Sequence, residues 1–459
     1  MDANRFSVRN RRVVIVGAAR SGVAAARLAH RMGARVVLTE TRAAFDEADA
    51  LHAEGIGLEL GGHTEATLAS ADLIVVSPGV PLEQPVFDVP RSNGTETVGE
   101  LEFASRWIDG RVIAITGTKG KSTTTTLVGR MLRAAGEHVL VGGNIGTPLS
   151  AQVGQATGKT IHVVEASSFQ LETTTTFHAW IAVWLNFADD HLDRHPTVDA
   201  YAAAKARIFA NQQAGDWAVV NADDAEVTRR ARGIAARRVE FSLAGSIRDG
   251  FVVDGDWIVQ RTGTASERLI PLSAVELTGR HMLNNVLAAA ATSQIAGVTP
   301  AAMVEALRGF HGLPHVMEPV AEAGGVRFVN DSKATNVEAS RRSIESFDRG
   351  VVAIIGGRYK GGDFGELREP LMTRGRAVVA IGEAASRVRD ALSGTVTVVG
   401  ATSMREAVSR AYDAAKPDGV VLLAPACSSF DWFRDYADRG DTFKREVAQL
   451  IERERRRES

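Results

Sequence analysis

Residues 117–123 read Gly-Thr-Lys-Gly-Lys-Ser-Thr, a spacing typical of a phosphate-binding loop. In such a loop the backbone N–H groups and the positive N-terminus of the following helix receive anionic oxygens. Lys121 can reach the β- and γ-phosphates of a nucleotide, and Ser122 can offer its hydroxyl to Mg²⁺. The sequence therefore predicts a nucleoside triphosphate site. The expected contacts are Gly117, Thr118, Lys119, Gly120, Lys121, Ser122 and Thr123.

Two further segments carry groups that could bind a metal ion or phosphate. The apolar residues 160–164 end at Glu165, and a carboxylate at the end of a strand beside the phosphate loop is suited to Mg²⁺. A charge at a helix N-terminus is the alternative interpretation of Glu165. Residues 186–195 gather three aspartates, two histidines and one arginine. This segment fits either a second metal or phosphate contact, with His191 as the candidate ligand, or a solvated loop.

Lys205 lies among small and apolar residues on a helix predicted at residues 198–210. Its ammonium group either extends to solvent, the commoner outcome, or is buried near a metal. In the buried case the lysine needs a lowered pKa or a chemical modification. Cys427 is the only cysteine, so an internal disulfide is excluded, and we expect a packed small side chain rather than a nucleophile.

The order of predicted strands and helices places these groups in an α/β protein of three domains. Residues 1–106 form a first Rossmann-like domain, 107–312 a central phosphate-loop domain with a parallel sheet, and 313–459 a third Rossmann-like domain. Ligands of open parallel sheets bind outside the carboxyl ends of the strands. Polar or glycine-rich segments follow many of the predicted strands, so we expect these strand ends to form the binding face.

The first domain begins like a dinucleotide-binding unit. A strand at residues 12–16 leads into a glycine turn at 17–22, and a second strand at 35–39 ends at Glu40. However, Ala19 stands at the position where a glycine normally lets a pyrophosphate approach the backbone. We therefore expect a nucleotide other than NAD or FAD.

The central domain changes character after its parallel strands. Residues 225 to about 272 are glycine-rich and alternate weakly, which predicts antiparallel hairpins. A helix at residues 286–296 follows, where Asn285 either caps the helix or reads an adenine edge. The predicted strands of the second and third domains are residues 112–116, 139–141, 160–164, 179–185, 217–221, 326–330, 351–355, 377–381 and 420–423.

Composition limits the class of protein. The chain has 459 residues, of which 45% are hydrophobic and 24% are charged, as in globular proteins. The net charge of −2 argues against nucleic-acid binding through bulk charge. No run of about 18 apolar residues occurs, so we expect no membrane span and a cytoplasmic location. We also expect a monomer.

Six motifs together carry a specific resemblance. They occupy residues 117–123, 142–146, 165–172, 190–194, 330–336 and 425–429. In this order they resemble the Mur ligases, the ATP-dependent amide ligases that build the peptidoglycan stem peptide, and the match runs from about residue 12 to 450. The segments at 167–172 and 330–336 look like those of the member that adds D-glutamate to UDP-N-acetylmuramoyl-L-alanine.

The resemblance implies a division of labour among the three domains. The first would bind the UDP-sugar, the central domain ATP, and the third the incoming amino acid. The implied UDP-sugar contacts are Arg20, Ser21, Glu40, Thr41, Asn144 and Ser167. The implied ATP contacts outside the phosphate loop are Asn285 and Asp331. The implied amino-acid contacts are Lys333, Thr335, Lys360, Ser429 and Tyr436.

The resemblance also implies a mechanism with Lys121, Glu165, His191 and Lys205 as the catalytic residues. Ser122 and Glu165 would hold one Mg²⁺ and His191 a second, beside Lys205, which matches the family's carbamylated lysine. The substrate carboxylate would attack the γ-phosphorus of ATP, and the glutamate amine would attack the resulting acyl phosphate.

Three positions depart from the family pattern. Val316 replaces an arginine thought to help hold ATP phosphates, Tyr436 replaces a phenylalanine near the amino-acid pocket, and Met282 replaces a polar residue near the nucleotide. None of them belongs to the phosphate loop or to the implied metal ligands. An active ligase is therefore the favoured interpretation.

Other functions remain as alternatives. A sister ligase that adds L-glutamate or another amino acid would keep the ATP motifs and differ in the third domain. A folylpolyglutamate-synthase-like enzyme shares the central domain, but the UDP-type first domain argues against it. A non-catalytic nucleotide-dependent regulator would have lost catalytic groups that are present here. Ala19 argues against a dehydrogenase.

Overall fold

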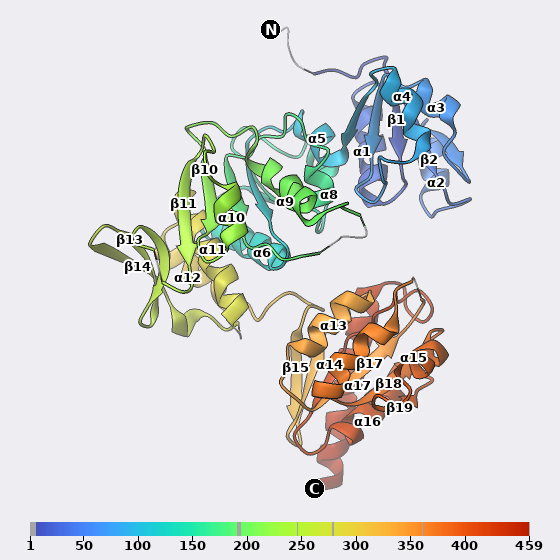
Figure 1. Cartoon of the computed structure of the whole chain (residues 1–459), viewed down its shortest axis with the longest axis vertical. Helices are drawn as coiled ribbons and strands as arrows, with labels where there is room; N and C mark the ends of the chain where they lie inside the picture. The colour runs from blue at the N-terminus through green and yellow to red at the C-terminus, as the bar shows by residue number, and fades with distance from the viewer. Residues whose placement is uncertain (1–5, 191–193, 246, 278–279, 360, 459) are drawn as a thin grey trace. The chain divides into compact units, whose positions relative to one another are not determined.

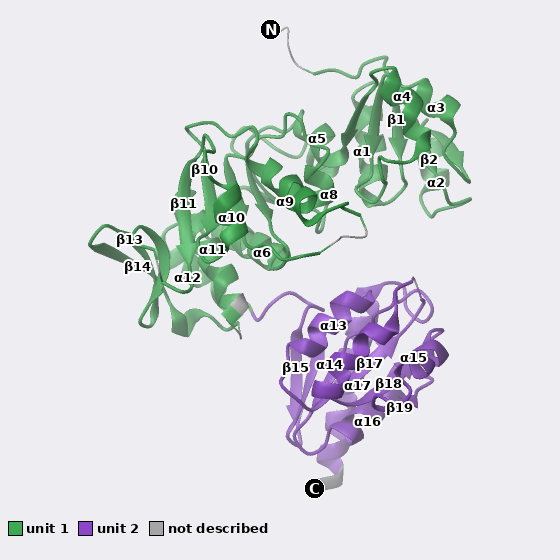
Figure 2. Cartoon of the chain, in the orientation of Figure 1, with its two compact units in different colours: residues 1–310 green, residues 311–459 purple. Residues whose placement is uncertain are grey.

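The protein is described by a computed structural model over residues 6–190, 194–245, 247–277, 280–359 and 361–458. The chain forms two compact units, residues 1–310 and 311–459 (Figure 2). The described residues contain three sheets with packed helices, of which two lie in the first unit and one in the second (Figure 1). The protein therefore has the α/β fold class that the sequence predicts.

The first sheet has five parallel strands in the order β3-β2-β1-β4-β5. Alternate residues of β1 pack into two different apolar clusters, one on each face, so its run of apolar residues is buried on both sides. The chain order reverses between β1 and β4, which makes their carboxyl ends the topological switch point of this sheet. The strands are β1 (Arg12–Val16), β2 (Arg35–Glu40), β3 (Gly57–Leu60), β4 (Leu73–Val76) and β5 (Glu96–Gly99), and the helices are α1 (Arg20–Arg31), α2 (Ala48–Ala53), α3 (Glu65–Ala69), α4 (Asp88–Ser92) and α5 (Glu100–Ser105).

The turn after β1 is shorter than predicted, because α1 begins at Arg20 rather than at residue 23. Gly22 permits this early start. A Cβ at this position would lie 1.8 Å from the carbonyl oxygen of Gly17, so only glycine lets the helix pack so closely on the strand end.

The second sheet has nine strands in the order β14-β13-β12-β11-β10-β9-β6-β8-β7. The stretch from β7 to β12 is parallel, and β12, β13 and β14 form an antiparallel extension. The strands are β6 (Arg111–Thr116), β7 (Val139–Gly143), β8 (Ile161–Glu165), β9 (Ile181–Trp184), β10 (Trp217–Asn221), β11 (Arg237–Ser242), β12 (Gly250–Asp254), β13 (Trp257–Thr262) and β14 (Ala265–Pro271). The helices are α6 (Lys121–Ala134), α7 (Leu149–Gln152), α8 (Ser168–Leu171), α9 (Val198–Ala206), α10 (Ala225–Arg230), α11 (Arg280–Ile295) and α12 (Pro300–Leu307).

The prediction of antiparallel hairpins from residue 225 to about 272 is wrong for β11. This strand pairs in parallel with β10 and with β12. The helix α10 lies between β10 and β11, and such a crossover returns the chain in the same direction. The hairpin prediction is confirmed for β12, β13 and β14, which pair antiparallel.

The sheet of the second unit has six strands in the order β15-β16-β20-β17-β18-β19. Among the described strands of this sheet only the edge strand β15 pairs antiparallel, and separate apolar clusters cover the two faces of the sheet. The strands are β15 (Glu318–Ala323), β16 (Val326–Asn330), β17 (Val351–Gly356), β18 (Gly375–Ile381), β19 (Thr397–Gly400) and β20 (Val420–Leu423). The helices are α13 (Val337–Glu345), α14 (Arg368–Arg374), α15 (Ala385–Leu392), α16 (Met404–Ala415) and α17 (Tyr436–Glu458).

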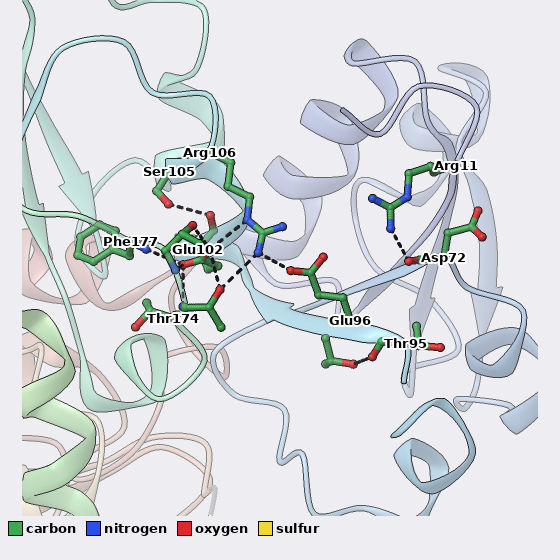
Figure 3. Close-up of polar contacts among 12 residues, drawn as sticks. Arg11, Asp72, Thr95, Glu96, Glu102, Ser105, Arg106, Thr174 and Phe177 are labelled. Carbon is green, nitrogen blue, oxygen red and sulfur yellow. Dashed lines mark hydrogen bonds and ion pairs between the residues drawn. The ribbon is translucent and has the colours of Figure 1, made fainter. Parts of the chain in front are cut away.

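A buried carboxylate connects the part of the chain that carries the first sheet to the part that carries the second. Glu102 of α5 is fully buried and accepts hydrogen bonds of 2.9, 3.0 and 2.9 Å from the N–H groups of residues 175, 176 and 177 (Figure 3). Arg106 donates to the same carboxylate at 3.0 Å and also pairs with Glu96 at 2.5 Å. Burial alone would raise the pKa of Glu102, but these donors outweigh it and lower the pKa below its usual value.

We expect Glu102→Ala to lower the free energy of unfolding by about 3–5 kcal/mol, because three backbone donors and Arg106 lose a buried acceptor. Glu96→Ala is the matched control. It removes the outer partner of the same arginine, whose carboxylate is 42% exposed, and should cost about 1 kcal/mol or less. Urea denaturation measures both changes, and equal losses would contradict the assignment of Glu102 as the main anchor.

The same contacts fix the direction of a pH effect. The pKa of Glu102 is lower in the folded than in the unfolded chain, so its stabilisation is complete above the unfolded value of about 4.3. It is lost as the pH falls through the folded value. The difference in stability between wild type and Glu102→Ala should therefore shrink on acidification.

None of the helices in the described part of the chain is both long enough and apolar enough to cross a membrane.

Candidate active site

The phosphate loop connects β6 to α6, and its geometry follows from its glycines. Gly120 has a φ of +81°, and a Cβ there would lie 2.1 Å from Oδ1 of Asn285. The residue must therefore be glycine for α11 to lie against the loop. Lys121 is the first residue of α6, and its ammonium group donates to the carbonyl oxygens of Gly117 at 2.9 Å and Thr118 at 3.0 Å. The lysine is thus held over the loop that would receive phosphate oxygens.

Asn285 does not cap a helix, because α11 begins at Arg280 and already contains this residue. Its side chain is buried, and its amide donates to the sulfur of Met282 at 3.8 Å. The cap interpretation is therefore wrong. Asn285 instead lies beside Gly120 at the phosphate loop. Its contact with a nucleotide stays a prediction.

Sequence reasoning missed Asn186, which fixes the shape of the loop. Its Oδ1 accepts from the N–H groups of Thr118 at 3.1 Å and Lys119 at 2.8 Å, and its Nδ2 donates to the Lys119 carbonyl at 3.0 Å. The available signal was its place directly after the strand predicted at residues 179–185, next to the phosphate-loop strand. A side-chain amide can satisfy both donors and acceptors of a neighbouring loop, which suits this role.

Glu165 brings two predicted site residues together. Its Oε2 accepts from the Ser122 hydroxyl at 2.6 Å, and its Oε1 accepts from the Asn144 amide at 2.7 Å. The carboxylate is 2% exposed at the end of β8. A carboxylate and a hydroxyl offer hard oxygen ligands of the kind that Mg²⁺ prefers, so Glu165 and Ser122 fit the predicted ion.

Lys205 is buried, with 1% of its surface exposed, so the alternative that it extends to solvent is wrong. Its ammonium nitrogen donates to the Gly117 carbonyl at 2.8 Å and lies 4.6 Å from the centre of the Tyr201 ring. Burial lowers the pKa of Lys205 well below its usual value, and the positive charge of Lys121 lowers it further. The shift favours the neutral amine over the ammonium ion.

His191, the predicted second metal ligand, lies outside the described residues. Within the described ranges no group of three His, Cys, Asp or Glu side chains is arranged to hold a metal ion. The described part of the chain resumes at Arg194 and His195. Arg194 donates to Glu172, directly after α8, and His195 contacts Ser168 in α8.

A cavity of about 500 Å³ lies at the switch point of the first sheet and extends to the loop after β7. Five of the six residues predicted to contact a UDP-sugar line it, namely Arg20, Ser21, Glu40, Thr41 and Asn144. The sixth, Ser167, does not line the cavity. Its hydroxyl accepts from the N–H of Gln170 and caps α8, whereas Gln170 itself reaches the cavity wall.

Glu40 lines this cavity, and several donors hold its carboxylate in place. Its carboxylate accepts from the Ala18 N–H at 2.7 Å, the Thr41 hydroxyl at 3.0 Å and the Arg42 guanidinium at 3.1 Å. Burial by itself would raise the pKa of Glu40, but these donors lower it to about 2. The residue is thus an anion at neutral pH and can accept hydrogen bonds from a ligand. Sequence reasoning did not identify Arg42, His63 and Gln84, which also line the cavity.

In the second unit the predicted residues gather at the carboxyl ends of β16 and β20. Asp331 follows β16 and is 7% exposed. Burial raises its pKa, although the Ser343 hydroxyl and the Met317 N–H donate to it. Lys333 is exposed and Thr335 is half-buried in the same loop, while Ser429 is buried after β20. Tyr436 is 40% exposed, and Lys360 lies outside the described residues.

Sequence reasoning missed Arg439, which ties these two loops together. Its fully buried guanidinium donates to the Ser332 hydroxyl at 3.0 Å, the Ser332 carbonyl at 2.9 Å and the Cys427 carbonyl at 3.0 Å. Burial lowers the pKa of Arg439 to about 10. Cys427 is buried as predicted, and burial raises the pKa of its thiol to about 12, which disfavours the nucleophilic thiolate.

Comparison with known proteins gives matches to the first, the central and the last part of the chain. The sequence matches the family profiles "Mur ligase MurD-like, N-terminal domain" over residues 11–99, "Mur ligase middle domain" over 115–293 and "Mur ligase, glutamate ligase domain" over 317–427. It is 45% identical over 444 residues to the UDP-N-acetylmuramoylalanine--D-glutamate ligase of Acidobacterium capsulatum, covering 96% of each chain. It is 42% identical to the enzyme of the same name from Desulfosudis oleivorans, covering 96% of this chain and 97% of that one.

Solved structures show the same fold at lower sequence identity. The chain is similar to the UDP-N-acetylmuramate-alanine ligase of Thermotoga maritima, with a TM-score of 0.57, 18% identity and coverage of 96% of this chain and 100% of that one. It is also similar to a pseudomurein peptide ligase type C of Methanothermus fervidus, with a TM-score of 0.55, 18% identity and the same coverage.

Proposed function

This chain belongs to the Mur ligase family, and we propose that it joins D-glutamate to UDP-N-acetylmuramoyl-L-alanine, using ATP. Curated relatives at 42–45% identity over nearly the whole chain carry the name of this ligase. The reaction forms an amide bond in the synthesis of the peptidoglycan precursor. A cytoplasmic location fits such a substrate.

One observation supports this function most directly. Asn144 lines the 500 Å³ cavity and also donates to Glu165 at 2.7 Å, while Glu165 accepts from Ser122 of the phosphate loop at 2.6 Å. The cavity proposed for the nucleotide-sugar therefore adjoins the groups that would hold ATP and its metal ion. Transfer of a phosphoryl group between two bound substrates requires this proximity.

The residues of the chain have separate tasks in the reaction. The N–H groups of the phosphate loop and Lys121 would orient the β- and γ-phosphates, which neutralises charge as it develops. The substrate carboxylate oxygen forms a bond to the γ-phosphorus, and ADP leaves. The glutamate amine then attacks the acyl phosphate, loses a proton and expels inorganic phosphate. Exclusion of water protects the acyl phosphate from hydrolysis.

Mg²⁺ is the metal that this site would take. Ser122 and Glu165 would hold it, and when bound it neutralises phosphate charge during transfer. We also propose Lys333, Thr335, Lys360, Ser429 and Tyr436 as contacts of the glutamate substrate, and Asp331 as a contact of ATP.

Phosphate release from ATP tests the proposal. The purified chain is incubated with UDP-N-acetylmuramoyl-L-alanine and either D-glutamate, L-glutamate or no amino acid. We expect release that depends on D-glutamate. Release that depends on L-glutamate would mean that the chain is a ligase whose substrate is L-glutamate rather than D-glutamate. No release with either amino acid would overturn the proposal and direct attention to Val316.

A further inference from the structure

Arg194 connects the central domain to the wall of the nucleotide-sugar cavity. Its guanidinium donates to Glu172 at 2.7 Å, to Glu83 at 3.3 Å and to the Val80 carbonyl at 3.4 Å. Glu172 follows α8, whereas Glu83 and Val80 belong to the loop after β4, and Val80 lines the cavity. The arginine is only 14% exposed. Arg194 thus links the part of the chain that carries the second sheet to the part that carries the first sheet.

His195 continues these contacts inward. It is 3% exposed, its Nε2 lies 3.0 Å from the Ser168 hydroxyl, and its Nδ1 lies 3.7 Å from Oε2 of Glu172. Its ring stacks on Phe169 at 5.3 Å and packs against Tyr201 at 5.3 Å. Arg194 and His195 therefore share Glu172, with Arg194 at Oε1 and His195 nearest to Oε2.

Tyr201 completes the connection to the phosphate loop. Its hydroxyl lies 3.3 Å from the hydroxyl of Thr118, and its ring lies 4.6 Å from the ammonium nitrogen of Lys205. Lys205 in turn donates to the Gly117 carbonyl. An uninterrupted series of contacts thus runs from Val80 at the cavity to Thr118 at the phosphate loop.

The bonding of Arg194 is incomplete in this arrangement. Its Nε is buried and has no hydrogen-bond partner among the described residues. A buried unpaired donor is unfavourable, so an arrangement that pairs it would be favoured. The loop at Val80 forms part of the cavity wall, so a ligand there can change which acceptors Arg194 meets. Such a difference between the empty and filled states is the requirement for coupling between two sites.

We infer that Arg194 and His195 are positioning residues that couple occupancy of the nucleotide-sugar cavity to the phosphate loop, so that each ligand strengthens the binding of the other. The inference rests on the proposed function, because it takes the two ligands to be UDP-N-acetylmuramoyl-L-alanine and ATP. The alternative is that Arg194 is only a structural link between the two segments.

Calorimetric titration distinguishes the two roles. The dissociation constant of UDP-N-acetylmuramoyl-L-alanine is measured with and without a saturating, non-hydrolysable ATP analogue in the presence of Mg²⁺. We expect the analogue to tighten binding to the wild-type chain by about fivefold or more. In Arg194→Ala the ratio of the two dissociation constants should fall to about twofold or less. Arg194→Lys keeps the charge but lacks the planar fork that reaches several acceptors, and should give an intermediate ratio.

One control and one further variant separate coupling from stability. Arg229→Ala removes an exposed arginine of the same unit that pairs with Glu226, and should leave the ratio unchanged. His195→Phe keeps the ring contacts but loses the bond to Ser168, and should lower the ratio even where its thermal midpoint matches wild type.

The outcomes also separate this inference from the proposed function. Failure of the wild-type chain to bind the UDP-sugar would overturn the proposed function. Binding of both ligands with a wild-type ratio near one, or an Arg194→Ala ratio equal to that of the wild type, would overturn the coupling alone. A purely structural link would weaken both measured affinities of Arg194→Ala by the same factor.

Discussion

Glu165→Gln is expected to slow phosphate release from ATP by about 10²–10³-fold, the cost of removing one preorganised charge-stabilising group. The substitution preserves the size of the side chain beside Ser122 and Asn144 but removes its negative charge. Because that charge would hold Mg²⁺, the half-saturating Mg²⁺ concentration should rise as well. Phosphate release measured over a range of Mg²⁺ concentrations reports both changes.

Glu137→Gln is the matched control for this experiment. It makes the same chemical change at an exposed glutamate of the same domain, after the end of α6. We expect it to turn over at the wild-type rate. A Glu165→Gln enzyme with an unaltered Mg²⁺ dependence would mean that the carboxylate serves only to order the loops around it.

Lys205→Ala is expected to lose activity by a similar factor, about 10²–10³-fold, and to recover part of it when a short carboxylic acid is added. Burial and the positive charge of Lys121 lower the pKa of Lys205, which favours the neutral, nucleophilic amine over the ammonium ion. Its nitrogen can then bond to the carbon of CO₂ and release a proton, which leaves a carboxylate-like group. A small acid entering the space left by the side chain would supply a similar charge.

The recovery on addition of acid separates this role from simple packing. Lys159→Ala removes an exposed lysine of the same domain and should neither lose activity nor respond to the acid. The comparison uses phosphate release by the three proteins with and without acetate or propionate. Full turnover by Lys205→Ala in the absence of acid would refute its role beside the metal.

Much of the fold could be predicted from local sequence patterns. Four strands have the predicted bounds, namely β1, β10, β16 and β20. Each is a short apolar run between turn residues, and such a run indicates a strand buried inside a sheet. The predicted antiparallel direction of β11 is wrong because the direction of a strand depends on the crossover at α10, not on the strand's own residues. The start of α1 was missed because it depends on the close approach of Gly22 to Gly17.

The candidate site divides in the same way. Residues on the loops themselves, such as Lys121 and Glu40, could be found because their position after a strand already suggests contact with a ligand. Asn186, Arg194 and Arg439 could not be assigned roles. Their contacts depend on which loops become neighbours in the folded chain.

The sequence by itself determined the phosphate loop, since seven consecutive residues between a strand and a helix specify its function through local backbone geometry. The tertiary structure alone decided how distant groups meet. Ser122 bonds Glu165 across 43 residues, and Lys205 bonds Gly117 across 88. Only the order of the strands brings their carboxyl ends together, and burial in that environment lowers the pKa of Lys205. Local patterns carry no information on either the strand order or the resulting burial.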